Sequence, residues 1–311
     1  MISVENLTKR YGSGPPSVDA VSFTCAPGTV TGFLGPNGAG KSTTLRMLTG
    51  LTPPSSGTAT VDGVRYRDLP NPGRVVGVML DAAAQHPGRT GRETVRLAAS
   101  LLGVPASRAD DMLERVGLAD ARRRRVRDYS LGMRQRLGIG VALLGDPSVL
   151  VLDEPANGLD PEGIRWMRQL LREFAAGGGT VLVSSHLLRE VEATVDRLVV
   201  IDHGRVVASG TKSDLLARTG GAGTLVRALD PRALAAALAA AGLTAQEQPD
   251  GAQLVQAGAE QVGRAAHAAG AVLVELRPAE AAGLEDLFFR LTSSEAGSST
   301  GTTPARQEVS A

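Results

Sequence analysis

One nine-residue stretch constrains this chain more than any other feature. The sequence GPNGAGKST fits the phosphate-loop pattern G-x-x-x-x-G-K-[S/T] at every fixed position. Glycines without Cβ let successive backbone N–H groups turn toward phosphate oxygens, and the helix N-terminus behind them adds partial positive charge. Lys41 is expected to reach the β- and γ-phosphates, and Ser42 to supply a hydroxyl ligand for Mg²⁺. The residues expected to hold the nucleotide here are Gly35, Pro36, Asn37, Gly38, Ala39, Gly40, Lys41, Ser42 and Thr43.

The flanking residues supply the structural context that a chance match would lack. Residues 29–34 are β-branched or apolar and predict a strand, and residues 41–51 predict a helix closed by Gly50. The alternative is a glycine-rich turn with an accidental lysine. The order strand, loop, helix favours a nucleoside triphosphate site instead.

The composition excludes several other classes of protein. The chain has 311 residues, of which 42% are hydrophobic, so it is long enough for a buried core plus a second module. Thirty-three basic and thirty-two acidic residues give a net charge of +1, which predicts no nucleic-acid partner. Cys25 is the only cysteine, which excludes an intrachain disulfide. No apolar run approaches the roughly 18 to 20 residues that span a bilayer, so we expect a membrane role to require a partner.

Acidic and histidine side chains follow two further predicted strands. Residues 148–152 are too apolar for a solvated strand and predict a buried parallel one, followed directly by Asp153 and Glu154. We expect Asp153 to hold Mg²⁺ and Glu154 to orient or deprotonate an attacking water. His186 follows the apolar residues 180–184, so it is expected at the same sheet edge, where a neutral imidazole can sense a γ-phosphate.

Three other features of the sequence each allow two interpretations. Tyr11 either stacks on the adenine base or is an ordinary surface tyrosine. Residues 82–144 have helical spacing and predict a helical insertion, in which the arginine run 122–125 favours a solvated face over a binding patch. Ser130 opens a predicted helix that runs to residue 144, and simple N-capping explains it on its own.

Taken together, these motifs resemble the nucleotide-binding subunit of ABC transporters over residues 1 to about 217. The resemblance implies an α/β P-loop cassette with a mixed sheet core and a helical subdomain at about 82–144, with ATP and Mg²⁺ as cofactors. It implies that Tyr11 stacks on adenine, that residues 35–43 are the Walker A loop, that Glu154 is the catalytic glutamate of Walker B, and that His186 is the switch histidine. It also implies that residues 157–160 are the D-loop.

The same resemblance implies a homodimer. Residues 129–133 look like the signature motif of the family, in which Ser130 and Gly132 of one subunit face the γ-phosphate held by the other subunit. The sequence here is YSLGM, whereas LSGGQ is the usual form.

A second departure lies after the strand predicted at residues 75–80. The family's usual glutamine is replaced by Asp81, while Gln85 lies close by. A carboxylate at this position is expected to bind Mg²⁺ directly, and Gln85 is the rival candidate for the family's glutamine. This stretch looks most like the antibiotic and multidrug exporter subgroup of bacterial ATP-binding subunits.

The expected function is therefore an ATPase subunit that drives export of drugs or antibiotics through a separate integral membrane permease. We expect it to be cytoplasmic and peripheral on the inner face of the cell membrane. The main alternative is a non-transport ABC ATPase; a metabolite kinase is weakened by the signature stretch and by Glu154.

The residues after the cassette predict a second module. Residues 223–292 read as strand, helix, strand, strand, helix, strand, followed by a last helix at 284–291. That order predicts a small α+β ferredoxin-like module. Residues 293–311 are rich in Ser, Gly and Thr and are expected to be a disordered tail.

Overall fold

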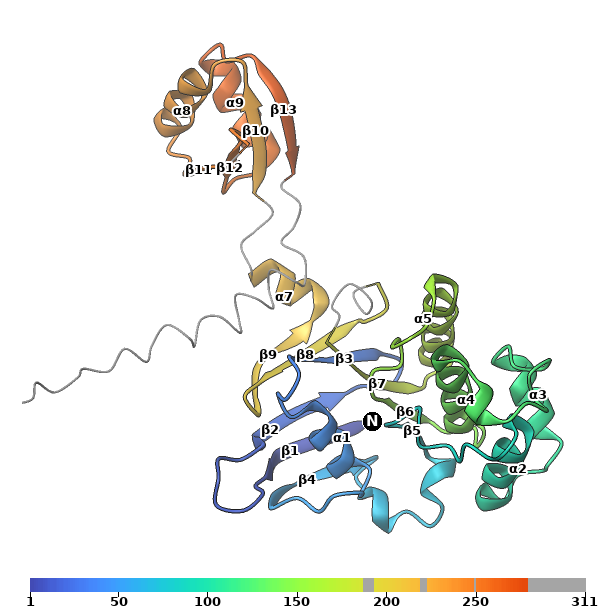
Figure 1. Ribbon diagram of the computed structural model, residues 1–311. Helices are drawn as coiled ribbons and strands as arrows, with labels where there is room; N and C mark the ends of the chain where they lie inside the picture. Colours follow the sequence, from blue (N-terminus) through green and yellow to red (C-terminus); the bar gives the residue numbers. More distant parts are fainter. Residues whose placement is uncertain (187–192, 219–222, 249, 279–311) are drawn as a thin grey trace, which may run out of the picture. The chain divides into compact units, whose positions relative to one another are not determined.

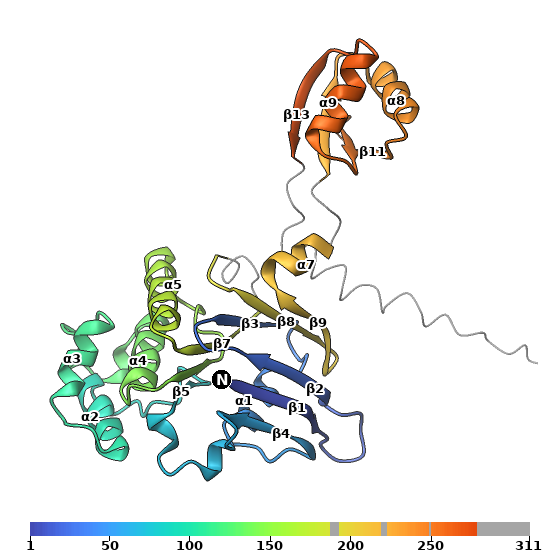
Figure 2. The ribbon, with the colours of Figure 1, turned by 180° about the vertical axis from the view of Figure 1, so that it is seen from behind.

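The computed structural model describes residues 1–186, 193–218, 223–248 and 250–278 (Figures 1 and 2). The chain divides into two compact units, Met1–Arg218 and Thr219–Ala311. The helix predicted at 284–291 and the tail predicted at 293–311 lie outside the described residues. The two units are taken separately below.

A six-stranded sheet forms the centre of the first unit. Its order is β5-β6-β7-β3-β8-β9, in which the first five strands are parallel and β9 is antiparallel. Every residue of β3, β6 and β7 is buried, as continuous apolar runs require when both faces of a parallel sheet are covered. The strands are β3 (Val30–Leu34), β5 (Val76–Met79), β6 (Val149–Leu152), β7 (Thr180–Ser185), β8 (Arg197–Asp202) and β9 (Arg205–Thr211).

A three-stranded antiparallel sheet packs against this core. It consists of β2 (Val18–Cys25), β1 (Ile2–Lys9) and β4 (Ser56–Val61), in that order. The rings of Phe23 and Phe33, one from each sheet, stack with centroids 5.2 Å apart. The strand β4 pairs antiparallel with β1, and the two backbones lie so close at Gly57 that a Cβ there would lie 2.2 Å from the Asn6 carbonyl oxygen.

The helices of the first unit lie around the large sheet, and those of residues 82–144 gather on one side. In both ribbon views α2, α3 and α4 lie beyond β5 and β6, away from β1, β2 and β4 (Figures 1 and 2). Within 82–144 the regular structure is helical, apart from one isolated bridge between Thr90 and Arg125. The helices are α1 (Lys41–Leu48), α2 (Gly91–Leu102), α3 (Arg108–Arg115), α4 (Leu131–Leu143), α5 (Pro161–Ala176) and α7 (Lys212–Arg218), with short 3₁₀ turns at Tyr66–Asp68, Pro72–Arg74 and Val126–Asp128.

The second unit has its own sheet and core. The elements follow the order β10 (Thr224–Ala228), α8 (Pro231–Ala240), β11 (Ala245–Glu247), β12 (Gln253–Val255), α9 (Ala259–Ala268) and β13 (Leu273–Pro278). All strand pairs are antiparallel, in the order β11-β12-β10-β13. Buried apolar side chains from both helices and the sheet, including Val226, Leu234 and Val262, form the core. This is the strand-and-helix order of a ferredoxin-like module.

No helix in the described part of the chain is both long enough and apolar enough to cross a membrane.

Candidate active site

The loop between β3 and α1 has the backbone geometry of a phosphate cradle. Gly38 and Gly40 have φ angles of 83° and 104°, in the left-handed region that side chains rarely adopt. A Cβ on Gly40 would lie 2.6 Å from the Ser17 carbonyl oxygen, and one on Gly35 would lie 2.4 Å from that of Ile201. Glycine is therefore required at both ends of the loop.

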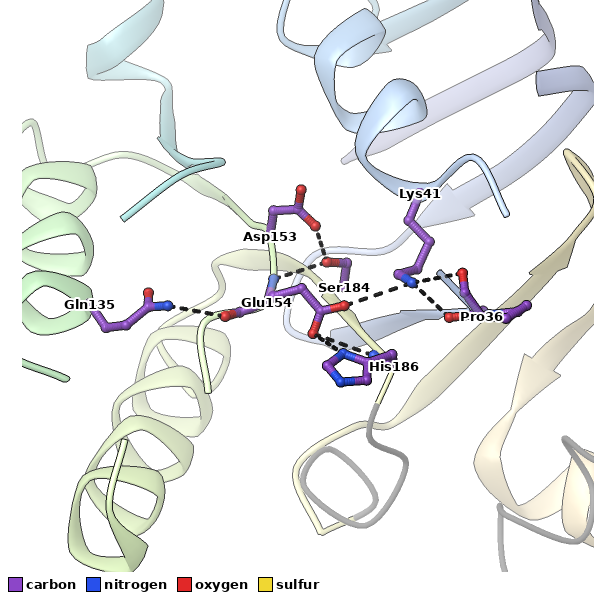
Figure 3. A network of polar contacts seen from close by, with 8 residues as sticks. Pro36, Lys41, Gln135, Asp153, Glu154, Ser184 and His186 are labelled. Atoms are coloured by element: carbon purple, nitrogen blue, oxygen red, sulfur yellow. Dashed lines mark hydrogen bonds and ion pairs between the residues drawn. The ribbon is translucent and has the colours of Figure 1, made fainter. Parts of the chain in front are cut away.

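Lys41, the first residue of α1, joins this loop to the end of β6. Its Nζ donates hydrogen bonds to the carbonyl oxygens of Gly35 at 2.6 Å and Pro36 at 3.2 Å, and lies 3.7 Å from Glu154 Oε1 (Figure 3). The side chain is only 6% exposed. Burial lowers the pKa of the Lys41 ammonium, while the nearby Glu154 and Asp153 carboxylates act in the opposite direction. A buried cation beside this glycine-rich loop suits a phosphate anion.

The two acids after β6 are held by a residue from the neighbouring strand. Ser184 Oγ, near the end of β7, donates to Asp153 Oδ1 and accepts a hydrogen bond from the Glu154 backbone N–H at 3.0 Å. Glu154 itself has a φ of 49°, a left-handed conformation that costs about 1–3 kcal/mol for a residue with a side chain. The sequence reasoning missed Ser184. Its position at the carboxyl end of a strand parallel to β6 is the signal that would have found it.

His186 completes the surroundings of Glu154. His186 Nδ1 lies 2.8 Å from Glu154 Oε2, and the His186 backbone N–H donates to the same oxygen at 3.4 Å. Because Lys41 lies at the other carboxylate oxygen, the Glu154 side chain is held from both sides (Figure 3). The structure thus brings together Lys41, Asp153, Glu154 and His186, as the sequence predicted for one sheet edge.

The predicted signature segment lies against the turn that follows Glu154. Ser130 caps α4, accepting a hydrogen bond from the Met133 N–H at 3.2 Å. A Cβ added to Gly132 would lie 2.9 Å from the Gly158 carbonyl oxygen, so the segment touches the predicted D-loop of its own chain. Further along α4, Gln135 Nε2 donates to the Glu154 carbonyl oxygen at 3.4 Å (Figure 3). No local sequence pattern singles out Gln135, since its contact depends on how α4 packs.

Three other predicted site residues are more exposed. Ser42 is exposed near the start of α1, and Tyr11 is 56% exposed with Lys9 Nζ 5.0 Å from its ring centroid. Asp81 is also exposed, and its Oδ1 accepts a hydrogen bond from the Ala83 N–H at 2.7 Å. Gln85 is half-buried, with its side-chain oxygen unpaired among the described residues.

Among the described residues, no group of three or more His, Cys, Asp and Glu side chains is placed to hold a metal ion by itself. The hydroxyl of Ser42 and the carboxylate of Asp153 nevertheless fit Mg²⁺, a hard cation that takes oxygen ligands and is usually bound by one or two carboxylates together with substrate phosphates.

A glycine cradle before a helix, with an acid pair at the end of another parallel strand of the same sheet, defines a P-loop domain that binds and hydrolyses a nucleoside triphosphate. Comparison with known proteins gives the family. The ABC transporter family profile matches residues 18–157, and a domain of unknown function (DUF8746) matches residues 222–285. The chain belongs to the ATP-binding proteins of the ABC transporter family.

Several curated proteins resemble most of the chain. A linearmycin resistance ATP-binding protein of Bacillus subtilis (strain 168) is 37% identical over 226 residues, which cover 71% of this chain and 72% of the relative. A daunorubicin resistance ATP-binding protein of Streptomyces coeruleorubidus is 40% identical over 228 residues, covering 71% of each. A bacitracin transport ATP-binding protein of Bacillus licheniformis is 41% identical over 210 residues, covering 67% of this chain and 68% of the relative.

Solved structures support the same fold. An ATP-binding subunit of an ABC transporter superposes with a TM-score of 0.65 at 29% identity, covering 70% of this chain and 93% of that one. A dimeric bacterial ABC transporter cassette matches with a TM-score of 0.62 at 24% identity, covering 68% of this chain and 98% of that one. The predicted family and the predicted cassette fold are confirmed, and the chain is an ATPase that binds ATP. ATP-binding subunits of this family work with separate membrane permeases and dimerise.

Proposed function

We propose that this protein hydrolyses ATP to power the export of an antibiotic or another drug through a separate integral membrane permease. The observation that carries the ATPase chemistry is the Glu154 carboxylate, held between Lys41 and His186 beside the glycine cradle. The direction and class of cargo are supported by relatives named for linearmycin resistance, daunorubicin resistance and bacitracin transport.

ATP is the substrate, and different residues of the site bind its phosphates, its base and the metal ion. Backbone N–H groups of residues 35–43, other than Pro36, surround the phosphates, and Lys41 contributes the point charge. The exposed ring of Tyr11 is available for the adenine base. Ser42 and Asp153 are the proposed ligands of Mg²⁺, with Asp81 as a further oxygen donor. When bound, the ion supplies positive charge that balances the phosphate oxygens.

Hydrolysis is assigned to the residues at the carboxyl ends of β6 and β7. Glu154 orients or deprotonates the attacking water, and His186 fixes the side of the carboxylate away from Lys41. Ser184 positions both acids through its hydroxyl, and so acts on the reaction without touching ATP.

The complete site is proposed to need a second copy of the chain. Ser130 and Gly132 lie at the N-terminus of α4, where partial positive charge favours an anion. In a head-to-tail homodimer, this end of α4 would face the γ-phosphate held by the other subunit. Binding to the permease would place the dimer on the inner face of the cell membrane.

The test of this function is to purify the tagged protein from native membranes and identify the integral membrane protein that accompanies it. We expect a permease, and we expect loss of either protein to make cells more sensitive to a drug. A Glu154→Gln variant should retain the permease and lose the resistance. Recovery with ribosomes, without any integral membrane protein, would favour a non-transport ABC ATPase.

A further inference from the structure

A basic surface lies on the helical insertion, and the ATP chemistry described above does not use it. Residues 82–144 contain twelve arginines, no lysine and six acidic residues, which gives a net charge of +6. The whole chain carries only +1, so the remaining residues together carry −5. The net charge of the chain is therefore near zero even though positive charge is concentrated in residues 82–144.

Backbone pairing brings arginines from two segments together. The Val126 N–H donates to the Arg89 carbonyl oxygen at 2.8 Å, and the Arg92 N–H donates to that of Arg122 at 2.9 Å. An antiparallel bridge joins Thr90 to Arg125. The run at 122–125, for which the sequence favoured a solvated face, therefore lies beside the segment that contains Arg89 and Arg92. We define the arginine surface as Arg89, Arg123, Arg124, Arg125 and Arg127.

Most of this charge is not neutralised. All five side chains are exposed. Within the described part of the chain, Arg127 alone among them has an ion pair, a 3.7 Å contact with the exposed Asp128. Glu93 is a second acid near this surface, and its carboxylate already accepts the Thr90 N–H at 2.7 Å. The pKa of Glu93 lies below its usual value, first because of its hydrogen bonds with Thr90 and then because of the Arg125 and Arg89 charges. Even with both acids ionised, the surface keeps an excess of positive charge.

Exposed leucines lie on the helix that begins next to this surface. The helix α2 starts at Gly91, and its Leu97 and Leu101 are 42% and 77% exposed. Their spacing of four residues places them on one face of the helix. Arg96, which precedes Leu97, is exposed as well. Arginines close to outward-facing leucines are typical of surfaces that bind the interface of an anionic membrane.

We propose that the arginine surface binds the phosphate groups of anionic phospholipids, so that this subunit touches the membrane directly as well as through a permease. Guanidinium groups bind phosphate oxygens in pairs, and each basic residue near an anionic membrane strengthens binding by roughly fivefold. The charges are exposed and spread over two segments, which suits a lipid surface better than one defined acidic peptide. This inference deepens the proposed location but does not depend on the permease.

The experiment uses the full-length protein and vesicles that contain no permease. Sedimentation measures binding to phosphatidylcholine vesicles and to vesicles that also contain phosphatidylglycerol, at low and high salt. The test variant removes four charges: Arg89→Gln, Arg123→Gln, Arg124→Gln and Arg125→Gln. The matched control removes four exposed charges elsewhere: Arg46→Gln, Arg65→Gln, Arg67→Gln and Arg232→Gln. Calorimetric ATP binding shows that each variant is folded and that the nucleotide site is intact.

We expect the wild type and the control to bind only the vesicles that contain phosphatidylglycerol, and salt to weaken that binding. The test variant should bind at least tenfold more weakly while keeping its ATP affinity. If the test variant does not fold, the salt and lipid dependence of the wild type still decides the question. The proposal would be overturned if the wild type bound both kinds of vesicle equally well. It would also be overturned if the control variant lost as much vesicle binding as the test variant. A test variant that keeps vesicle binding but loses a permease in lipid-free detergent would overturn it as well, because the surface would then recognise an acidic protein segment.

Discussion

His186 Nδ1 lies 2.8 Å from Glu154 Oε2, while the other oxygen of the same carboxylate faces Lys41 Nζ at 3.7 Å. The base proposed for hydrolysis is therefore tied to the phosphate-binding lysine on one side and to the predicted switch histidine on the other. Lys41 is the first residue of α1, which follows β3, and His186 directly follows β7. The position of the Glu154 carboxylate therefore depends on how β3, β6 and β7 pack at this edge.

The hydroxyl of Ser184 should support both stability and turnover. In a Ser184→Ala variant the part-buried Glu154 N–H loses its acceptor, which costs about 1–3 kcal/mol in the free energy of unfolding. Chemical denaturation measures this loss, and phosphate release should fall more than ATP affinity does. The matched control is Ser22→Ala, where an exposed hydroxyl accepts the Asn6 N–H at 2.8 Å. Equal effects of the two changes would contradict the positioning role of Ser184.

Lys41 should destabilise the nucleotide-free protein at neutral pH. Burial lowers its pKa, so the unfolded chain binds this proton more tightly than the folded one. The penalty is fully present below the folded pKa and is relieved as pH rises from there toward the ordinary lysine value of 10.5. A Lys41→Met variant should therefore unfold at a higher denaturant concentration than the wild type at pH 7. Its gain in the free energy of unfolding should shrink as the pH approaches 10.5. The variant should also lose MgATP binding. A gain that grows with pH would contradict this account.

The proposed composite site predicts complementation between two inactive variants. Lys41→Ala should inactivate the loop of its own chain, and Ser130→Arg should block the site of the partner. In the mixed dimer, one site combines an intact loop with an intact α4 terminus, so ATPase activity should return on mixing. Phosphate release from the mixture is compared with that of each variant alone. Mixed dimers that form and remain inactive would argue against head-to-tail sharing.

Local sequence patterns were enough to predict the loop, the strands of the large sheet and the meeting of four site residues. Residues 35–43 have a spacing that only a phosphate cradle needs, and buried parallel strands end at a common edge, which placed Asp153, Glu154 and His186 together. The order of elements in the second unit also followed from alternating strand and helix patterns.

Features that depend on pairing between distant segments were not predicted. The pairing of β4 with β1 is one example, because it aligns Ile2 with Val61 and Glu5 with Thr58, which lie far apart in the chain. Gly57 fits closely against Asn6 within this pairing, and no local pattern reveals that contact. Ser184, Gln135 and the pairing of Arg89 with the arginine run were missed for the same reason, since each contact joins residues far apart in the chain.

Replacing Glu154 by Gln tests the central claim most directly. The change keeps the shape of the side chain and removes its ability to accept a proton, so ATP affinity measured by calorimetry should remain near that of the wild type. Phosphate release should fall by about 10²- to 10⁴-fold, the usual contribution of a general base. The control is Glu162→Gln, the same change at an exposed position in the first turn of α5, which should leave turnover unchanged. Near-normal phosphate release by Glu154→Gln would contradict the account and place the base elsewhere.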